Sequence, residues 1–187
     1  MYWQTDLETM PRDRLRALQL QRLQETVARL ETSVPFYQNQ FANIRFTADE
    51  LRTLEDIRRL PFTTNADLRN HYPYGLVAVP PNRLSRLHTS SGTTGKPKAI
   101  FFSHRDVDQA AELVARCLIM VGATADDVLQ NMMTYGLFTG ALVVHYGAEK
   151  VGMLVIPAGP GNSERQLLLM RDFGTTLFHC TPSYAPY

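Results

Sequence analysis

The sequence predicts an α/β fold: a helical N-terminal segment, then a β-hairpin, then a mostly parallel sheet flanked by helices. Three observations predict it. Apolar residues recur at helical spacing through residues 11–34. Two short apolar runs, 84–88 and 99–102, flank a polar Gly-containing stretch, as the two strands of a hairpin do. Beyond them, short apolar runs alternate with helical patterns, which is the order of a parallel α/β layer.

The first helix is expected over residues 11–34. Its apolar face is formed by Leu20, Leu23, Val27, Leu30 and Val34. Arginines on its other faces would also suit a membrane surface. Three acidic residues interrupt them, however, so we favour packing of this helix against the domain. Pro35 should end the helix, and Phe36-Tyr37 should anchor the chain in the core.

Two further helices are expected before the hairpin. Leu51, Leu54 and Ile57 share a helical face, which predicts a helix over residues 47–60. Thr63 or Thr64 should cap a short helix that runs through Asp67 and Leu68. The Pro-rich residues 72–81 are expected to form an extended connector.

The later elements follow the same periodicities. Helices are expected at residues 104–121, 140–150 and 163–172, and buried strands at 153–156 and 176–180. Gly122 and Gly152 stand where helices are expected to end.

Length and composition limit the possible classes. A chain of 187 residues with 44% apolar residues can bury one sizeable core. We therefore expect a single domain, mainly helical over 1–81 and α/β over 82–187. A net charge of +1 argues against a nucleic-acid partner. Without a signal-peptide pattern or an apolar run long enough for a membrane, a cytoplasmic location without membrane contact is expected. The two cysteines form neither a metal motif nor a disulfide framework.

The polar stretch in the hairpin carries the strongest functional signal. Its hydroxyl groups donate to phosphate oxygens, its glycines allow close backbone approach, and its lysines add positive charge. The residues expected to bind phosphate are Ser90, Ser91, Gly92, Thr93, Thr94, Gly95, Lys96 and Lys98. The stretch is not a Walker A loop, because only two residues separate its glycines and a proline follows Lys96. A flexible Ser/Thr/Gly linker is the alternative reading.

The sequence of this stretch, Ser-Ser-Gly-Thr-Thr-Gly-Lys-Pro-Lys, resembles the phosphate loop of the acyl-adenylate-forming superfamily. Further segments in family order are similar to phenylacetate–CoA ligases. They are Leu60-Pro61-Phe62-Thr63, Asp67-Leu68-Arg69, Tyr72-Pro73-Tyr74-Gly75-Leu76, Tyr135-Gly136-Leu137-Phe138-Thr139-Gly140, His145-Tyr146-Gly147-Ala148-Glu149 and Thr181-Pro182-Ser183-Tyr184. The resemblance implies the N-terminal part of the large domain of an adenylate-forming enzyme.

The same resemblance implies an aryl-acid pocket formed by residues 133–140. We call these residues the acid segment. The residues expected to bind the acid are Met133, Tyr135, Gly136, Phe138 and Gly140. Tyr135 and Phe138 would otherwise be read as ordinary core aromatics. Met133 replaces an aromatic residue of the family, so a different acid is also consistent with the pattern. His145 is expected to be structural, paired with Glu149 four residues on, rather than a base.

The implied activity is the AMP-forming synthesis of an acyl-CoA from a carboxylic acid, with ATP, Mg²⁺ and CoA. The family's later Tyr-Gly-x-Thr-Glu segment and its C-terminal lid Lys are absent here, because Tyr135-Gly136 is followed by Leu-Phe-Thr. We therefore expect an N-terminal portion that is inactive alone, has no catalytic residue of its own and associates with itself or with a complementing half. The alternative is a non-catalytic nucleotide-binding or assembly module derived from a split or degenerate ligase.

Overall fold

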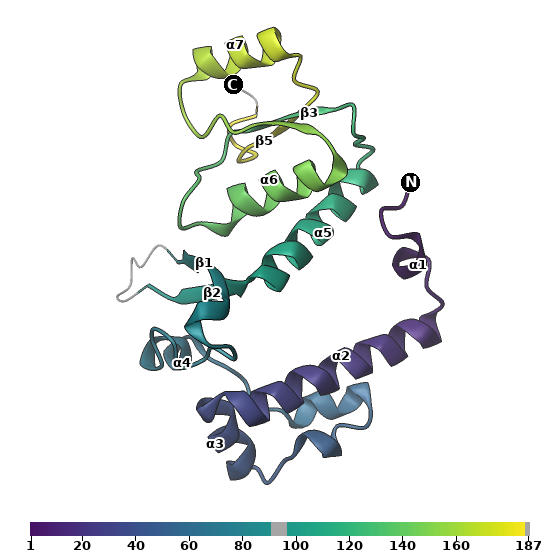
Figure 1. The fold of residues 1–187 in the computed structure, drawn as a ribbon, viewed down its shortest axis with the longest axis vertical. Coiled ribbons are helices and arrows are strands. Elements are labelled where there is room, and N and C mark those ends of the chain that lie inside the picture. The colour runs from purple at the N-terminus through teal and green to yellow at the C-terminus, as the bar shows by residue number, and fades with distance from the viewer. Residues whose placement is uncertain (91–96, 186–187) are drawn as a thin grey trace. The chain divides into compact units, whose positions relative to one another are not determined.

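The computed structural model describes residues 1–90 and 97–185. These residues form two compact units. The helical unit consists of Thr5–Leu84 and Thr89–Phe101, and the sheet unit consists of Met1–Gln4, Ser85–His88 and Phe102–Tyr187. Each unit has its own buried core. The residue ranges of the units can be followed by colour in Figure 1. That the whole chain is one incomplete domain stays a prediction.

The helical unit begins with α1 (Thr5–Glu8), α2 (Arg12–Ser33) and α3 (Pro35–Asn43). Val27 on α2 packs with Phe41, Phe46 and Leu51 in a buried cluster. The remaining apolar positions of α2 cover this cluster, which confirms the predicted face of the long helix: Leu20, Leu23 and Leu30. The predicted packing of α2 against its own unit is thus confirmed.

The junction after α2 also follows the expectation. Val34 is fully buried, and its N–H donates to the Leu30 carbonyl as the helix ends. Pro35 then opens α3, where its missing N–H costs nothing. Phe36 is buried, so the predicted anchor is confirmed.

The predicted helix over 47–60 is wrong. This region forms two short 3₁₀ helices, η1 (Ala48–Glu50) and η2 (Leu54–Arg59). Thr47 and Thr53 each build a capping box, so the sequence contains two helix starts where one was assumed. Leu51 lies between them and is buried, and its carbonyl accepts a bond from Gln24 Nε2 at 2.7 Å. Ile57 is 53% exposed, so the presumed shared face does not exist.

Helix α4 (Asn65–Asn70) begins as predicted, with Thr64 as its N-cap and Asp67 closing the capping box. The extended connector predicted after it is wrong at its start, because residues 71–76 form tight turns. The Gly75 N–H donates to the His71 carbonyl at 2.8 Å. A Cβ at Gly75 would lie 2.7 Å from that same oxygen, which explains the glycine at this turn.

A short 3₁₀ turn, η3 (Pro81–Arg83), leads into β1 (Leu84–Thr89), which pairs with β2 (Ala99–Ser103). The two strands predicted on either side of the polar stretch are therefore confirmed. The pairing continues one step beyond β1, where the Ser90 N–H donates to the Lys98 carbonyl at 3.2 Å.

The sheet unit contains α5 (His104–Met120), β3 (Val128–Asn131), α6 (Thr139–Val151), β4 (Leu154–Ile156), α7 (Ser163–Phe173) and β5 (Leu177–His179). The strands are parallel in the order β4-β3-β5. Helix α6 covers one face of this sheet and α7 the other (Figure 1). The predicted α/β class is thus confirmed, with each later helix and strand within three residues of its expected bounds.

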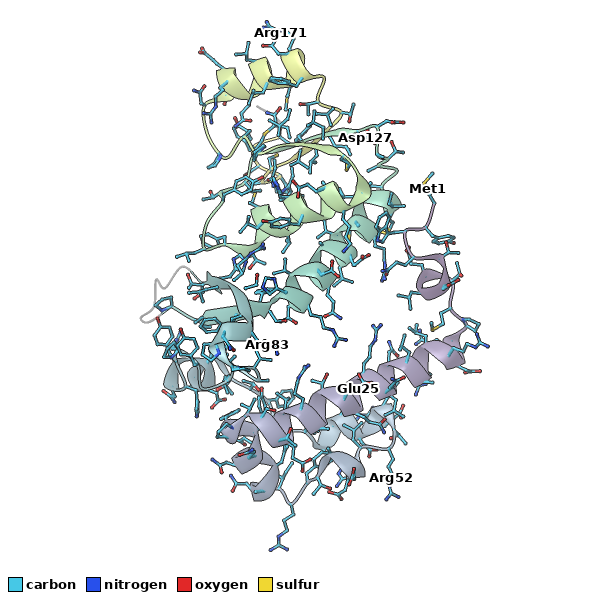
Figure 2. All side chains as sticks on the ribbon, viewed as in Figure 1. Met1, Glu25, Arg52, Arg83, Asp127 and Arg171 are labelled. Atoms are coloured by element: carbon cyan, nitrogen blue, oxygen red, sulfur yellow. The ribbon has the colours of Figure 1, made fainter. Side chains whose placement is uncertain are left out.

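Polar contacts join the strands at the N-terminal end of this sheet. Asp127, labelled in Figure 2, precedes β3 and accepts from Thr176 Oγ1 at 2.7 Å, next to the start of β5. The Thr124 N–H also donates to Asp127. The bond from Thr176 contributes most to lowering the pKa of Asp127, and the bond from Thr124 adds to it, because both stabilise the ionised carboxylate.

Helices α5 and α6 pack closely through a glycine. A Cβ at Gly147 on α6 would lie 2.5 Å from the Cβ and Cγ1 atoms of Val114 on α5. Lys150 ties the same helices by bonding to Asp108 and, at 2.9 Å, to Glu112. Glu112 also accepts from Trp3 Nε1 at 2.6 Å, which joins the first residues of the chain to this unit. No helix in the two described stretches has the length and apolar character that a membrane crossing needs.

Replacing Gly147 by Ala should lower the free energy of unfolding by about 1–3 kcal/mol, because the added methyl group overpacks the contact with Val114. Gly140→Ala is the matched control, since it lies on the same helix and a Cβ there meets nothing within 4 Å. That control should be neutral or stabilising by up to about 1 kcal/mol. Urea unfolding followed by circular dichroism measures both, and equal effects would contradict the packing argument.

Candidate functional site

The loops of the candidate site leave the sheet at two buried amides, Gln130 and Asn131, which end β3. Both side chains are fully buried. Gln130 Nε2 donates to Gln166 Oε1 at 2.6 Å and to the Gln166 carbonyl at 3.1 Å. Thr175 Oγ1 donates to Gln130 Oε1 at 2.9 Å. Gln130 therefore joins β3 to α7 and to the residues before β5.

The Asn131 side chain bonds to elements on the other face of the sheet. Its Nδ2 donates to the Ala141 carbonyl on α6 at 2.8 Å. Its Oδ1 accepts from His179 Nδ1 at 3.1 Å and from the Met133 N–H at 3.3 Å. Because a buried amide is costly unless its partners are in place, this residue fixes where the acid segment leaves the sheet.

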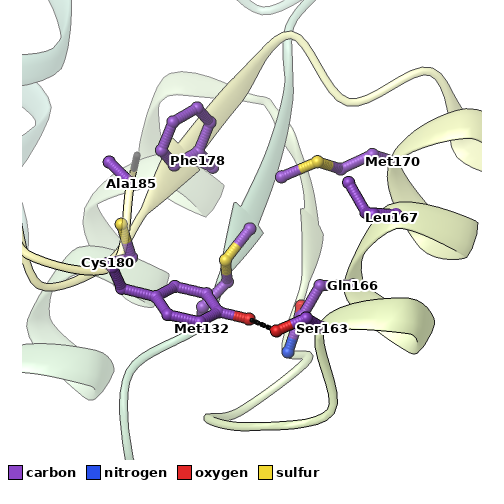
Figure 3. A pocket seen from close by; sticks show the side chains of 9 residues that line it. Met132, Ser163, Gln166, Leu167, Met170, Phe178, Cys180 and Ala185 are labelled. Atoms are coloured by element: carbon purple, nitrogen blue, oxygen red, sulfur yellow. Dashed lines mark hydrogen bonds between the residues drawn. The ribbon is translucent and has the colours of Figure 1, made fainter. Parts of the chain in front are cut away.

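Two adjoining cavities lie beyond the C-terminal ends of β3 and β5, each of about 180 Å³. Met132, Cys180 and Tyr184 line both. Met133 lines the second, together with Pro160 and Thr181. Figure 3 shows the first cavity, where Ser163 Oγ and Tyr184 O–H form a 2.7 Å hydrogen bond. Such a position beyond parallel strands is where α/β folds collect ligands.

Tyr135 points elsewhere, toward α6. Its O–H group lies 3.1 Å from His145 Nδ1, and His145 Nε2 lies 3.1 Å from Glu149 Oε1. The carboxylate accepts from Nε2–H, so Nδ1 accepts from the tyrosine O–H. Burial raises the pKa of Tyr135. Both ring nitrogens of His145 are thus engaged, which supports its predicted structural role.

The remaining predicted acid-binding residues do not line either cavity. Phe138 is the N-cap residue of α6 and is 56% exposed. Gly136 has φ +138°, a conformation that other residues avoid, and Gly140 lies in the first turn of α6. The structure therefore brings Met133 to a cavity, while Tyr135 contacts α6 and Phe138 faces outward.

Of the predicted phosphate-binding residues, the described part of the chain includes Ser90 and Lys98. Ser90 Oγ accepts from the Lys98 N–H at 3.0 Å. Lys98 Nζ donates to Asn65 Oδ1 at 3.0 Å, a neutral partner. The other six lie outside the described residues: Ser91, Gly92, Thr93, Thr94, Gly95 and Lys96. Among residues 1–90 and 97–185, no cluster of His, Cys, Asp and Glu is arranged to hold a metal ion.

His88 on β1 contacts the acid segment across a long separation in the sequence. Its side chain is 2% exposed, and Nδ1 lies 3.1 Å from the Leu137 carbonyl oxygen in the acid segment. Its ring meets Phe102 edge-on, with centroids 5.2 Å apart. The 49-residue separation from Leu137 hides this contact from any local pattern; the one available signal was a histidine in a short apolar strand.

The family model described as AMP-binding enzyme matches residues 13–186, which is nearly the whole chain. The chain belongs to this family. The resemblance predicted from the sequence is likewise confirmed. The chain is 48% identical over 185 residues to the phenylacetate–coenzyme A ligase of Thermus thermophilus, covering 99% of the chain and 42% of that protein. It is 43% identical to the Escherichia coli (strain K12) ligase of the same name, covering 95% of the chain and 41% of that protein.

Solved structures agree with this family membership. A 2-hydroxyisobutyryl-CoA ligase in complex with 2-HIB-AMP and CoA superposes with a TM-score of 0.92 and 30% identity. The match covers 99% of this chain and 41% of that one. The chain thus spans about two fifths of the length of its relatives.

The burial of His179 predicts that the stability of the chain depends on pH. Burial lowers the pKa of His179, so the unfolded chain binds this proton more readily. The free energy of unfolding should therefore be fully retained above the unfolded pKa of about 6.5 and should fall as pH drops below it toward the folded pKa.

Urea unfolding at pH 7.5 and pH 5.5 measures this fall. His179→Asn keeps a side-chain N–H near Nδ1 but does not titrate, so its loss between the two pH values should be smaller. An equal loss in the parent chain and the variant would rule out His179 as the titrating group.

Proposed function

We propose that this chain is the N-terminal part of an AMP-forming aryl-acid–CoA ligase, most like phenylacetate–CoA ligase. The observation that carries the proposal is a match over almost the whole chain to ligases of that name, together with the TM-score of 0.92 to a ligase in complex with an acyl-AMP and CoA. The proposed reaction has two steps. An acid carboxylate attacks the α-phosphorus of ATP and releases pyrophosphate, and the CoA thiol then displaces AMP.

The phosphate loop, Ser90 to Lys98, would hold the β and γ phosphates of ATP. Hydroxyl and backbone N–H donors strengthen as negative charge moves onto the leaving pyrophosphate, so such a loop lowers the barrier by electrostatic stabilisation. Ser90 and Lys98 begin and end the loop, and their mutual bonds hold its two ends together. Lys98, whose described partner is neutral, supplies positive charge there.

The acid would bind beyond the ends of β3 and β5, in the cavity that Met133 lines. This cavity is bordered by thioethers, a thiol and a tyrosine ring, which suit an apolar acyl group. Each of the two adjoining cavities has a volume of about 180 Å³, which gives room for about one small ring. Tyr135, Gly136, Phe138 and Gly140 stay proposed acid-binding residues, although they do not line this cavity.

The remaining chemistry would be supplied from outside this chain. Its described residues do not offer a set of Mg²⁺ ligands, so no step is assigned to a metal here. We expect residues 1–187 alone to bind nucleotide weakly and to form no acyl-CoA. A complementing portion would supply the rest of the site, which the greater length of the relatives supports, and the chain would also self-associate in the cytoplasm.

A non-catalytic nucleotide-binding or assembly module is the second candidate. In the part of the chain that the structure describes, β4 and β5 each pair only with β3, which leaves two sheet edges for another polypeptide. The two candidates differ in one measurement. A ligase in which this chain replaces the matching portion of the Thermus thermophilus protein should catalyse acid-dependent pyrophosphate exchange only if the first is correct.

Replacing Thr93 and Thr94 together by Val in this hybrid ligase should reduce acid-dependent pyrophosphate exchange at least about tenfold. Each hydrogen bond to a charged phosphate is worth about 1.5–3 kcal/mol, and about 1.4 kcal/mol corresponds to a factor of ten. Thr26→Val is the control, because its hydroxyl bonds only within α2, to the Arg22 carbonyl at 2.8 Å. If the double variant exchanged pyrophosphate as fast as the parent, the assignment of the phosphate loop would be wrong.

Met133→Tyr should change the ranking of aryl acids more than it changes the KM for ATP, because Met133 borders the proposed acid cavity. The kcat/KM values for a series of ring-substituted phenylacetates measure this ranking in the hybrid ligase. Met120→Tyr, at a position 73% exposed on α5, is the control. A uniform loss over all acids would mean that Met133 serves packing alone.

A further inference from the structure

His88 adopts one neutral tautomer because of what its Nδ1 contacts. The Leu137 carbonyl oxygen, 3.1 Å away, can only accept a hydrogen bond, so Nδ1 carries the proton. Nε2 of the neutral ring then presents a lone pair. This atom is buried and has no hydrogen-bond partner among the residues that the structure describes.

Packing alone does not explain an imidazole at this place. A leucine or phenylalanine would fill the space beside Phe102 without burying an unmet acceptor, which destabilises a folded chain. What the imidazole adds over such a residue is the Nδ1–H bond to Leu137. That bond is therefore the feature to explain.

The acid segment has few bonds of its own at this point. Between residues 134 and 138, no backbone N–H donates to a backbone carbonyl of residues 1–90 or 97–185. Gly136 stands in this stretch with φ +138°, and a glycine there leaves the backbone free to adopt other conformations. Leu137 and Phe138 are each 56% exposed, so little packing restrains them.

Two histidines restrain the segment from outside. His145 holds the Tyr135 side chain at 3.1 Å, and His88 holds the main chain at Leu137. Of these two tethers, the one from His88 acts on the backbone directly after Gly136 and directly before Phe138. It therefore limits where the Phe138 ring can lie.

We propose that His88 is a positioning residue that, through its Nδ1–H bond to the Leu137 carbonyl, sets which acids the acid segment accepts. The effect on acid choice rests on the proposed ligase function, whereas the tether does not. His88 acts through Leu137 and Phe138 and is not itself in contact with the reacting atoms.

The tether is tested first on the 187-residue chain. Nitrogen-15 NMR of the imidazole should show His88 protonated at Nδ1 and unprotonated at Nε2; the opposite tautomer would overturn the proposal. His88→Leu removes the donor at similar volume, while His88→Asn keeps an N–H near Nδ1. Nitrogen-15 relaxation should give backbone order parameters at residues 136–138 that fall toward the flexible range, below about 0.6, in His88→Leu and that stay within about 0.1 of the parent's values in His88→Asn.

The order parameters of β3 serve as the internal control for folding and should stay unchanged in both variants. Unchanged order parameters of residues 136–138 in a folded His88→Leu chain, or equal decreases in both variants, would overturn the tether.

Acid choice is tested in the hybrid ligase with phenylacetate and 2-hydroxyisobutyrate. His88→Leu should change the ratio of their kcat/KM values about three- to tenfold and leave the KM for ATP within about twofold, while His88→Asn retains the parent ratio. An equal loss for both acids with a raised KM for ATP would overturn the role in acid choice. If the unsubstituted hybrid activates no acid, the proposed function fails, while the order parameters of residues 136–138 still decide the tether.

Discussion

The arrangement of the candidate site depends on two amide side chains that end one strand inside the sheet unit. Gln130 and Asn131 are consecutive, so their side chains point to opposite faces of the sheet. Gln130 binds α7 and Thr175, and Asn131 binds α6 and His179. An unmet buried amide costs about 1–3 kcal/mol, roughly twice the net gain from a typical hydrogen bond, so both layers must dock in one register. The same contacts place the cavities and the start of the acid segment.

Much of the fold could be predicted because its signals are local. Capping residues and terminal glycines mark several helices directly: Thr64 begins α4, Ser103 begins α5, and Gly152 ends α6. Where the prediction failed, a local signal was present but overlooked. The two threonines before η1 and η2 each start a helix, and a side chain from α2 takes the Leu51 carbonyl that a continuous helix would use.

The candidate site was less accessible to sequence reasoning, for a physical reason. Motifs locate the phosphate loop and the acid segment along the chain, but side-chain directions depend on distant partners. Tyr135 turns to α6 because His145 accepts a hydrogen bond from its hydroxyl group, and Met133 lines a cavity together with the distant residues Pro160 and Thr181. His88 carries no motif at all, and its partner Leu137 belongs to a segment that local patterns treat separately.

The strand order of the sheet has a consequence for how the sheet unit folds. The central strand, β3, precedes both of its neighbours in the chain, since the order is β4-β3-β5. The side-chain partners of Gln130 lie 36 and 45 residues further on, and His179 lies 48 residues beyond Asn131. During synthesis β3 therefore emerges before most of its partners, so Gln130 remains hydrated until α7 and Thr175 have been made, and Asn131 meets His179 only at the end of β5. A hairpin can close as soon as its second strand appears, but this sheet assembles late and cooperatively, at the pace set by its longest loop closures.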